Sequence, residues 1–185
     1  LQVTGFDAAP LLRRNDEEAG SDLPPLPVDL RLGSLWFSTG QPVQNVAARL
    51  VYDGKLWRSI DLAGSFGEKR NLTLKVGTAG TTRTLSFESS DAGATLRALD
   101  IAETVNGGRL LLALTRDATK DDAPWRGNFA MRDINVVKAP VLARTLALAS
   151  LTGINNALTG KGIKFARVDV PVVGRGPAAY FSTLP

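Results

Sequence analysis

The sequence contains no cysteine and no histidine among its 185 residues. Without cysteine, the chain can form no disulfide, offer no thiolate nucleophile and bind no metal through sulfur. Without histidine, it lacks the most common general base of enzymes and the most common metal ligand of proteins. Carboxylates are therefore the main remaining candidates for acid–base chemistry or metal binding.

Aromatic residues are also scarce, at 6% of the chain, and the basic residues are scattered. The net charge is +4, but no basic run exceeds a pair such as Arg13 and Arg14. A nucleic-acid surface usually shows a basic stripe with interleaved aromatic residues, so we expect no nucleic-acid partner. The hydrophobic share of 44% and the charged share of 22% are typical of a folded domain with a core.

Three acidic residues, Asp117, Asp121 and Asp122, cluster in the polar segment DATKDDAP beside Lys120. This segment is typical of a solvated hairpin tip, whereas a catalytic carboxylate needs a buried setting that tunes its pKa. The spacing also differs from that of a calcium-binding loop. We therefore expect no catalytic residue, no metal and no cofactor.

The chain begins at Leu1 in the middle of a pattern and shows no signal-peptide pattern. We expect residues 1–185 to be a single segment of a larger protein. Near its start, a weakly alternating stretch (1–6) predicts a strand, and Asp7 is suited to cap a short helix to about residue 13. Residues 15–25 read NDEEAGSDLPP, which predicts a flexible acidic loop.

Alternating apolar and polar residues predict a series of strands with short turns between them. The fold class is therefore α+β, with a curved, groove-like antiparallel β-meander sheet and two main helices. A break or bulge is expected at Arg132 and Asp133. The expected strands cover about 28–32, 46–52, 56–63, 71–76, 82–88, 109–116, 125–137 and 163–173, with a further strand from about 179.

The first main helix is expected at about 91–105, capped by Ser90 and Asp91 and ended by Gly107 and Gly108. The second, at 139–158, is apolar nearly all round and carries Arg144 as its one charge. It approaches the length of a membrane span, but its polar residues argue against one. Two interpretations stay open: a core helix packed on the sheet, or a helix that contacts lipid or a partner.

One face of the sheet is expected to be apolar, because successive side chains of a strand point to opposite faces. Leu30, Leu50, Leu74, Phe87, Leu112 and Phe129 should share this face, while Asp29, Arg31 and Arg49 should face away. If the apolar face is open, it can shelter acyl chains. The alternative is a closed core beneath the helices. The candidate lipid-binding residues are Val28, Leu30, Leu32, Leu50, Leu72, Leu74, Phe87 and Leu112.

Two segments carry a resemblance to a known family. They are DAGATLRALDIAETVNGGRLLLAL (91–114) and INVVKAPVLARTLALASLTGINNALTGKGIKFARVDVP (134–171). Together they resemble the C-terminal region of AsmA-like bacterial envelope proteins, the group that includes YhdP and, more distantly, TamB. The motif residues in the second helix are Pro140, Leu142, Arg144, Leu146, Ser150, Leu151, Gly153 and Ile154.

This resemblance implies a periplasmic segment of a protein that is anchored in the inner membrane of a Gram-negative bacterium. Such proteins are implicated in phospholipid transport between the inner and outer membranes and in outer-membrane homeostasis, and the family brings no catalytic residues. The implied partners are phospholipid acyl chains, neighbouring segments of the same polypeptide and envelope proteins. The alternative function is an envelope scaffold that binds protein partners in outer-membrane assembly.

Overall fold

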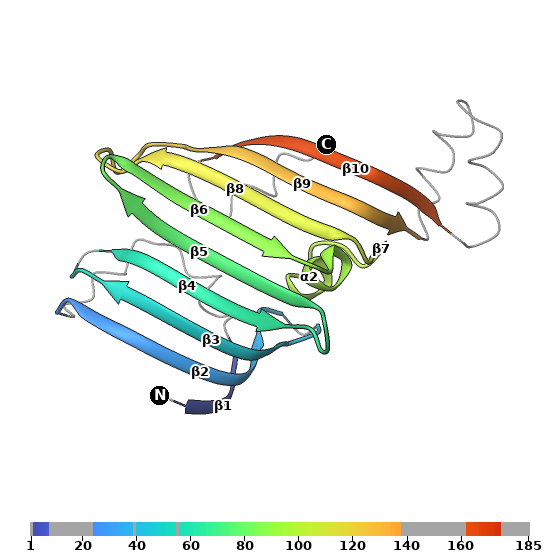
Figure 1. Cartoon of the computed structure of the whole chain (residues 1–185), viewed down its shortest axis with the longest axis horizontal. Coiled ribbons are helices and arrows are strands. Elements are labelled where there is room, and N and C mark those ends of the chain that lie inside the picture. The colour runs from blue at the N-terminus through green and yellow to red at the C-terminus, as the bar shows by residue number, and fades with distance from the viewer. Residues whose placement is uncertain (1, 8–23, 39, 55, 138–161, 175–185) are drawn as a thin grey trace.

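The structure, a computed structural model, describes residues 2–7, 24–38, 40–54, 56–137 and 162–174. These residues form one ten-stranded sheet and a single short helix, α2 (Ala92–Ala98) (Figure 1). The strands are β1 (Gln2–Asp7), β2 (Leu26–Trp36), β3 (Val43–Tyr52), β4 (Trp57–Ser65), β5 (Asn71–Ala79), β6 (Thr82–Ser89), β7 (Val105–Asn106), β8 (Arg109–Asp117), β9 (Trp125–Val136) and β10 (Ile163–Gly174).

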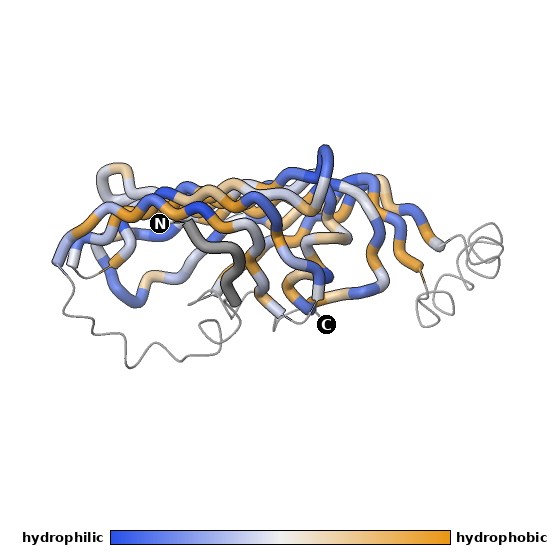
Figure 2. Tube along the Cα trace, turned by 90° about the horizontal axis from the view of Figure 1, so that it is seen from below, coloured by the Kyte–Doolittle hydropathy of each residue, from blue (hydrophilic) through white to orange (hydrophobic). Residues whose placement is uncertain are grey.

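The strands lie side by side nearly in chain order, from β1 at one edge to β10 at the other, and β7 pairs with β9 outside this path. Every described pairing is antiparallel except that of β1, which runs parallel to β2. The sheet does not close into a barrel, since β1 and β10 do not meet. It forms a curved layer with α2 on its concave side (Figure 2). The predicted antiparallel meander is confirmed, and the parallel β1 is an addition that the pattern did not show.

One continuous row of apolar side chains crosses eight strands. Directly opposite residues of paired strands share a face, and the pairings link Leu30 to Val170 by unbroken steps. The row runs Leu30, Ala48, Leu62, Leu74, Phe87, Leu112, Phe129, Val170. Leu50 lies on the same face, because it stands two residues from Ala48 in β3. We call this side the apolar face, and the opposite side the outer face.

The outer face carries a row of charges of alternating sign. Asp29 lies opposite Arg49, Arg49 opposite Asp61, and Asp61 opposite Lys75. Arg49 Nε donates to Asp29 at 2.9 Å, and this hydrogen bond together with the carboxylate charge raises the pKa of Arg49. Arg31 is exposed, whereas Leu30 is half-buried. The predicted assignment of Asp29, Arg31 and Arg49 to the outward side therefore agrees with the register.

The first main helix is shorter than predicted: it spans Ala92–Ala98 instead of 91–105. Asp100 adopts a left-handed conformation with φ of 58°. Its N–H donates to the Arg97 carbonyl at 3.1 Å, and the N–H of Ile101 donates to the Leu96 carbonyl at 2.9 Å. This pair of bonds is a Schellman motif, which ends a helix. The chain then turns back, so Val105 belongs to β7 and is buried.

The Gly107–Gly108 pair was predicted to end the helix, and this is wrong. Its carbonyls instead accept hydrogen bonds from the first turn of α2: Ala92 N–H donates to Gly108 O at 2.8 Å, and Gly93 N–H to Gly107 O at 3.1 Å. The first N–H groups of a helix have no partner within it, so the glycine pair satisfies two of them. Gly107 and Gly108 both have positive φ, at 61° and 78°, which suits glycine.

The predicted break in β9 is present at Asp133, where φ is 53°. The pairing with β10 skips this residue, passing from Arg132 opposite Arg167 to Ile134 opposite Phe165. Beyond the break, Ile134 is buried again, at 3% exposure. Before the break, the odd-numbered Phe129 and Met131 face the apolar side, whereas after it the even-numbered Ile134 is buried. The break at Asp133 therefore shifts the alternation by one residue and keeps the end of the strand apolar on that side.

Several predicted segments lie outside the described residues. They are the helix at 139–158 with its family motif, the helix to residue 13, most of the acidic loop at 15–25 and the strand from 179. Within the described ranges, no helix has both the length and the hydrophobicity that a membrane span requires.

Candidate functional site

The apolar face holds a cavity of about 520 Å³ beside α2. Its walls come from strands β3 to β10, from α2, and from the segments that follow β2 and α2. The lining is apolar apart from the hydroxyl of Thr95. Side chains that define the cavity include Leu74, Phe87, Leu112, Phe129, Met131 and Leu99. Binding pockets for small molecules usually have volumes of about 300–1,000 Å³, so this cavity is large enough to receive an apolar group.

Four of the eight predicted lipid-binding residues line this cavity: Leu72, Leu74, Phe87 and Leu112. The other four lie on the apolar face but not at the cavity. These are Val28, Leu30, Leu32 and Leu50. The register therefore brings all eight to one face, while the tertiary structure divides them into two groups.

The group outside the cavity lies beside a closed core. Leu32 is 4% exposed and packs with Val43, Val46 and Phe66, and Leu30 packs against this cluster from its side. Ala94 and Ala98 of α2 complete the same cluster. Val43, Phe66, Leu72 and Ala98 of this cluster also line the cavity, so the closed core adjoins it. Whether the cavity shelters acyl chains stays a prediction.

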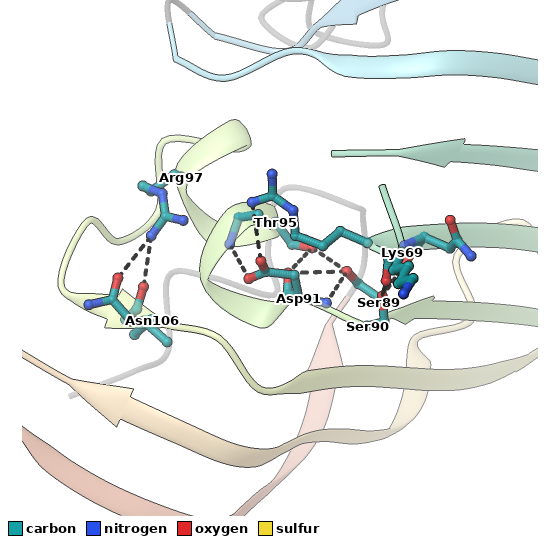
Figure 3. Close-up of polar contacts among 11 residues, drawn as sticks. Lys69, Ser89, Ser90, Asp91, Thr95, Arg97 and Asn106 are labelled. Carbon is teal, nitrogen blue, oxygen red and sulfur yellow. Dashed lines mark hydrogen bonds and ion pairs between the residues drawn. The ribbon is translucent and has the colours of Figure 1, made fainter. Parts of the chain in front are cut away.

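Buried polar contacts hold α2 on the apolar face (Figure 3). Thr95 Oγ1 lies 2.8 Å from Ser89 Oγ at the end of β6, and both residues are buried. Asp91 caps the helix, because its carboxylate accepts from the Ala94 N–H at 2.8 Å. The Asp91 carboxylate also lies 3.6 Å from the guanidinium of Arg70. These contacts attach the start of the helix to β6 and to the β4–β5 connection.

The other end of α2 is attached through Arg97 (Figure 3). Its Nη1 donates to the Val105 carbonyl at 2.9 Å and lies 3.4 Å from Asn106 Oδ1. Gly93 allows the close approach of helix and β7, since a Cβ there would lie 2.4 Å from the Val105 oxygen. The helix is thus fixed to the sheet at both ends, and one wall of the cavity is fixed with it.

Sequence reasoning missed the wall formed by Leu99, Ile101, Ala102 and Val105. The sequence predicts all four in a helix that continues to about residue 105, whereas the helix ends at Ala98. A signal was present in Asp100, because aspartate is among the few residues that tolerate the left-handed conformation that ends a helix.

The acidic cluster lies at the β8–β9 hairpin, away from the cavity lining. Asp117 accepts hydrogen bonds from Thr119 N at 2.9 Å and from Thr119 Oγ1 at 2.6 Å. These bonds, and the nearby Lys120, lower the pKa of Asp117. Across the residues that the structure describes, no three acidic side chains are grouped as metal ligands would be.

No family model, no curated protein and no solved structure matches this chain. The resemblance to AsmA-like proteins therefore stays a prediction from the sequence.

Proposed function

We propose that this chain is a non-catalytic periplasmic segment of an inner-membrane-anchored AsmA-like protein that takes part in phospholipid transport between the inner and outer membranes. In this proposal the cavity on the apolar face shelters acyl chains. The observation that carries the proposal is the cavity itself, whose lining side chains are apolar except for Thr95, and the Thr95 hydroxyl is bonded to Ser89 and Asp91. A site of this composition suits a hydrocarbon chain better than any polar substrate.

The energetics support a tail-binding role. Burial of each methylene group contributes about 0.8 kcal/mol, so six methylenes give about 5 kcal/mol before the costs of binding. No specific polar contact is needed to hold a chain by this means. A conduit gains from such a site, because it can accept lipids with different acyl chains.

The test compares two neighbouring residues of β8 that lie on opposite faces. Leu112 lines the cavity, whereas Ala113 is exposed on the outer face. The chain is purified with Leu112→Asp or Ala113→Asp, and copurified lipid is extracted and quantified by mass spectrometry. We expect phospholipid with the original chain and with Ala113→Asp, and at least a tenfold loss with Leu112→Asp, about the effect of 1.4 kcal/mol in binding.

Circular dichroism establishes whether both variants are folded. Absence of phospholipid from the original chain, together with no binding of added lipid, would contradict the proposal. Equal lipid retention by the two folded variants would place the lipid somewhere other than this cavity.

A second candidate function is an envelope scaffold that binds protein partners or neighbouring segments of the same polypeptide. One observation favours it: β10 is an edge strand of 12 residues whose described pairing is with β9 alone. Val173 on this strand is 56% exposed. Edge strands are common places for the addition of a further strand. Photocrosslinking from position 173 in cells distinguishes this candidate by trapping a protein instead of a lipid.

A further inference from the structure

Two arginines lie directly opposite each other at one end of the apolar face. Arg83 of β6 pairs with Arg116 of β8 in an unbroken register. Two residues along the same register, Leu85 lies opposite Leu114, and both of these leucines line the cavity. Since side chains two residues apart in a strand share a face, the arginines lie on the same face as the cavity, next to its apolar wall. They lie at the opposite end of β6 from α2 (Figure 1).

This pair is unfavourable by itself, because like charges directly opposite each other in a sheet repel. Both arginines are half-buried, which reduces the screening of this repulsion by water. Burial and the charge of Arg116 lower the pKa of Arg83. In the described ranges, neither guanidinium forms an ion pair with a carboxylate. The negative charge of Asp53 opposes this lowering of the Arg83 pKa. The Asp53 carboxylate, however, accepts a hydrogen bond from Arg58 Nε at 2.8 Å, so its charge is shared with a second arginine.

Each guanidinium also keeps one terminal nitrogen, Arg83 Nη1 and Arg116 Nη2, without a hydrogen bond to the described residues. Arg83 Nη2 donates to the Trp57 carbonyl at 2.6 Å, and Arg116 Nη1 lies 3.4 Å from the Asp121 carbonyl. The Nε atoms of both arginines are buried and have no hydrogen-bond partner. Arg116 stacks on the ring of the buried Trp125, with its Cζ atom 5.1 Å from the ring centroid, and this contact holds the guanidinium in place. A terminal guanidinium nitrogen that lacks a partner can donate to the acceptor oxygens of a ligand.

We propose that Arg83 and Arg116 form a phosphate-binding subsite at the end of the cavity, so that one ligand places its apolar tail against Leu85 and Leu114 and its phosphate between the two guanidinium groups. This inference rests on the proposed function and extends it to an amphiphile with an anionic phosphate. Arginine suits this role, because its planar fork of donors matches the oxygens of a phosphate. A phosphate between the two cations also removes their repulsion.

The test uses three probes in calorimetric titrations of the whole chain: dihexanoyl phosphatidate, dihexanoylglycerol and inorganic phosphate. The first carries both tail and phosphate, the second only the tails, and the third only the phosphate. The variants are Arg83→Gln and Arg116→Gln. Arg109→Gln is the control, because Arg109 lies opposite Arg132 in another cross-strand pair, exposed on the outer face.

We expect dihexanoyl phosphatidate to bind at least about tenfold more tightly than either other probe, and each subsite variant to weaken it by about tenfold, as the loss of a charged hydrogen bond implies. Arg109→Gln should leave its affinity within about twofold. Circular dichroism should show both subsite variants folded, since each removes a like-charge contact along with the hydrogen bond to Trp57 or the stacking on Trp125.

Three outcomes would overturn the subsite. In the first, phosphatidate and dihexanoylglycerol bind equally and the arginine variants change nothing, which leaves the tail-binding proposal standing. In the second, inorganic phosphate binds as tightly as phosphatidate, which separates the arginines from the apolar tail. In the third, neither lipid probe binds, and the proposed function fails together with the subsite.

Discussion

Thr95 of α2 and Ser89 of β6 bring their hydroxyl oxygens to 2.8 Å from each other beneath the helix. Both residues are nearly inaccessible to solvent, at 2% and 4% exposure. The contact joins the helix to the strand that precedes it, and Thr95 also lines the cavity. The position of this cavity wall therefore depends on a polar contact within an otherwise apolar region.

Replacing Thr95 with valine tests this attachment, because valine keeps the shape of threonine and removes the hydroxyl. The Thr95 hydroxyl also lies 2.9 Å from the Asp91 carbonyl, so both contacts are lost. We expect the free energy of unfolding to fall by about 1–2 kcal/mol. Urea denaturation measures this change. Thr95→Ser, which keeps the hydroxyl, should cost less than Thr95→Val, and the reverse order would show that packing matters more than the contact.

Gly93→Ala should destabilise the protein, although the same change inside a helix usually stabilises by about 0.5–1 kcal/mol. The new Cβ would lie 2.4 Å from the Val105 oxygen and 2.9 Å from Asn106 Cα, so α2 must move away from β7. The matched control is Gly77→Ala in β5, where a Cβ meets no atom within 4 Å. Thermal melting should show a lower midpoint for Gly93→Ala alone. Equal midpoints for the two variants would contradict the close contact of α2 and β7.

The same charge substitution should have different effects at Leu32 and at Leu74. Leu32 lies in the closed core, so Leu32→Asp buries an unpaired carboxylate and should unfold the protein. Leu74 is half-buried beside the cavity, where water can reach the new carboxylate. We expect Leu74→Asp to fold and to bind less lipid. Circular dichroism and a lipid-binding assay measure the two effects, and unfolding of both variants would show that the cavity wall is a closed core as well.

Acid titration should reveal the contact between Asp169 and Arg167 on β10. The Arg167 guanidinium donates to this carboxylate and holds the pKa of Asp169 below the ordinary value of an aspartate. A lowered pKa in the folded state stabilises the protein above the unfolded pKa, and this stabilisation is lost as the pH falls through the folded pKa. Carboxyl titration by NMR should therefore give a higher pKa for Asp169 in Arg167→Gln. An unchanged titration of Asp169 would show that the ion pair does not form in solution.

The strand pattern could be predicted because it is local. Alternation of apolar and charged residues in stretches such as 28–32 indicates which side chains share a face of the sheet. It does so because successive side chains of a strand point to opposite faces, which depends only on backbone geometry. The chain order of the meander follows from short turns in the same way. For these reasons the sequence by itself determined the antiparallel sheet, its apolar face and the outward position of Asp29 and Arg49.

The tertiary structure decided which part of that face is covered. Leu32 and Leu74 look alike in the sequence, each being a leucine in an alternating strand, yet one lies in the closed core and the other beside the cavity. The difference arises from where α2 lies, and this depends on contacts between residues far apart in the chain, such as Ser38 Oγ donating to the Ala98 carbonyl at 3.1 Å. The meeting of Arg83 and Arg116 likewise depends on register between strands. Local patterns specify which way a side chain faces, whereas its neighbours are set by packing across the whole sheet.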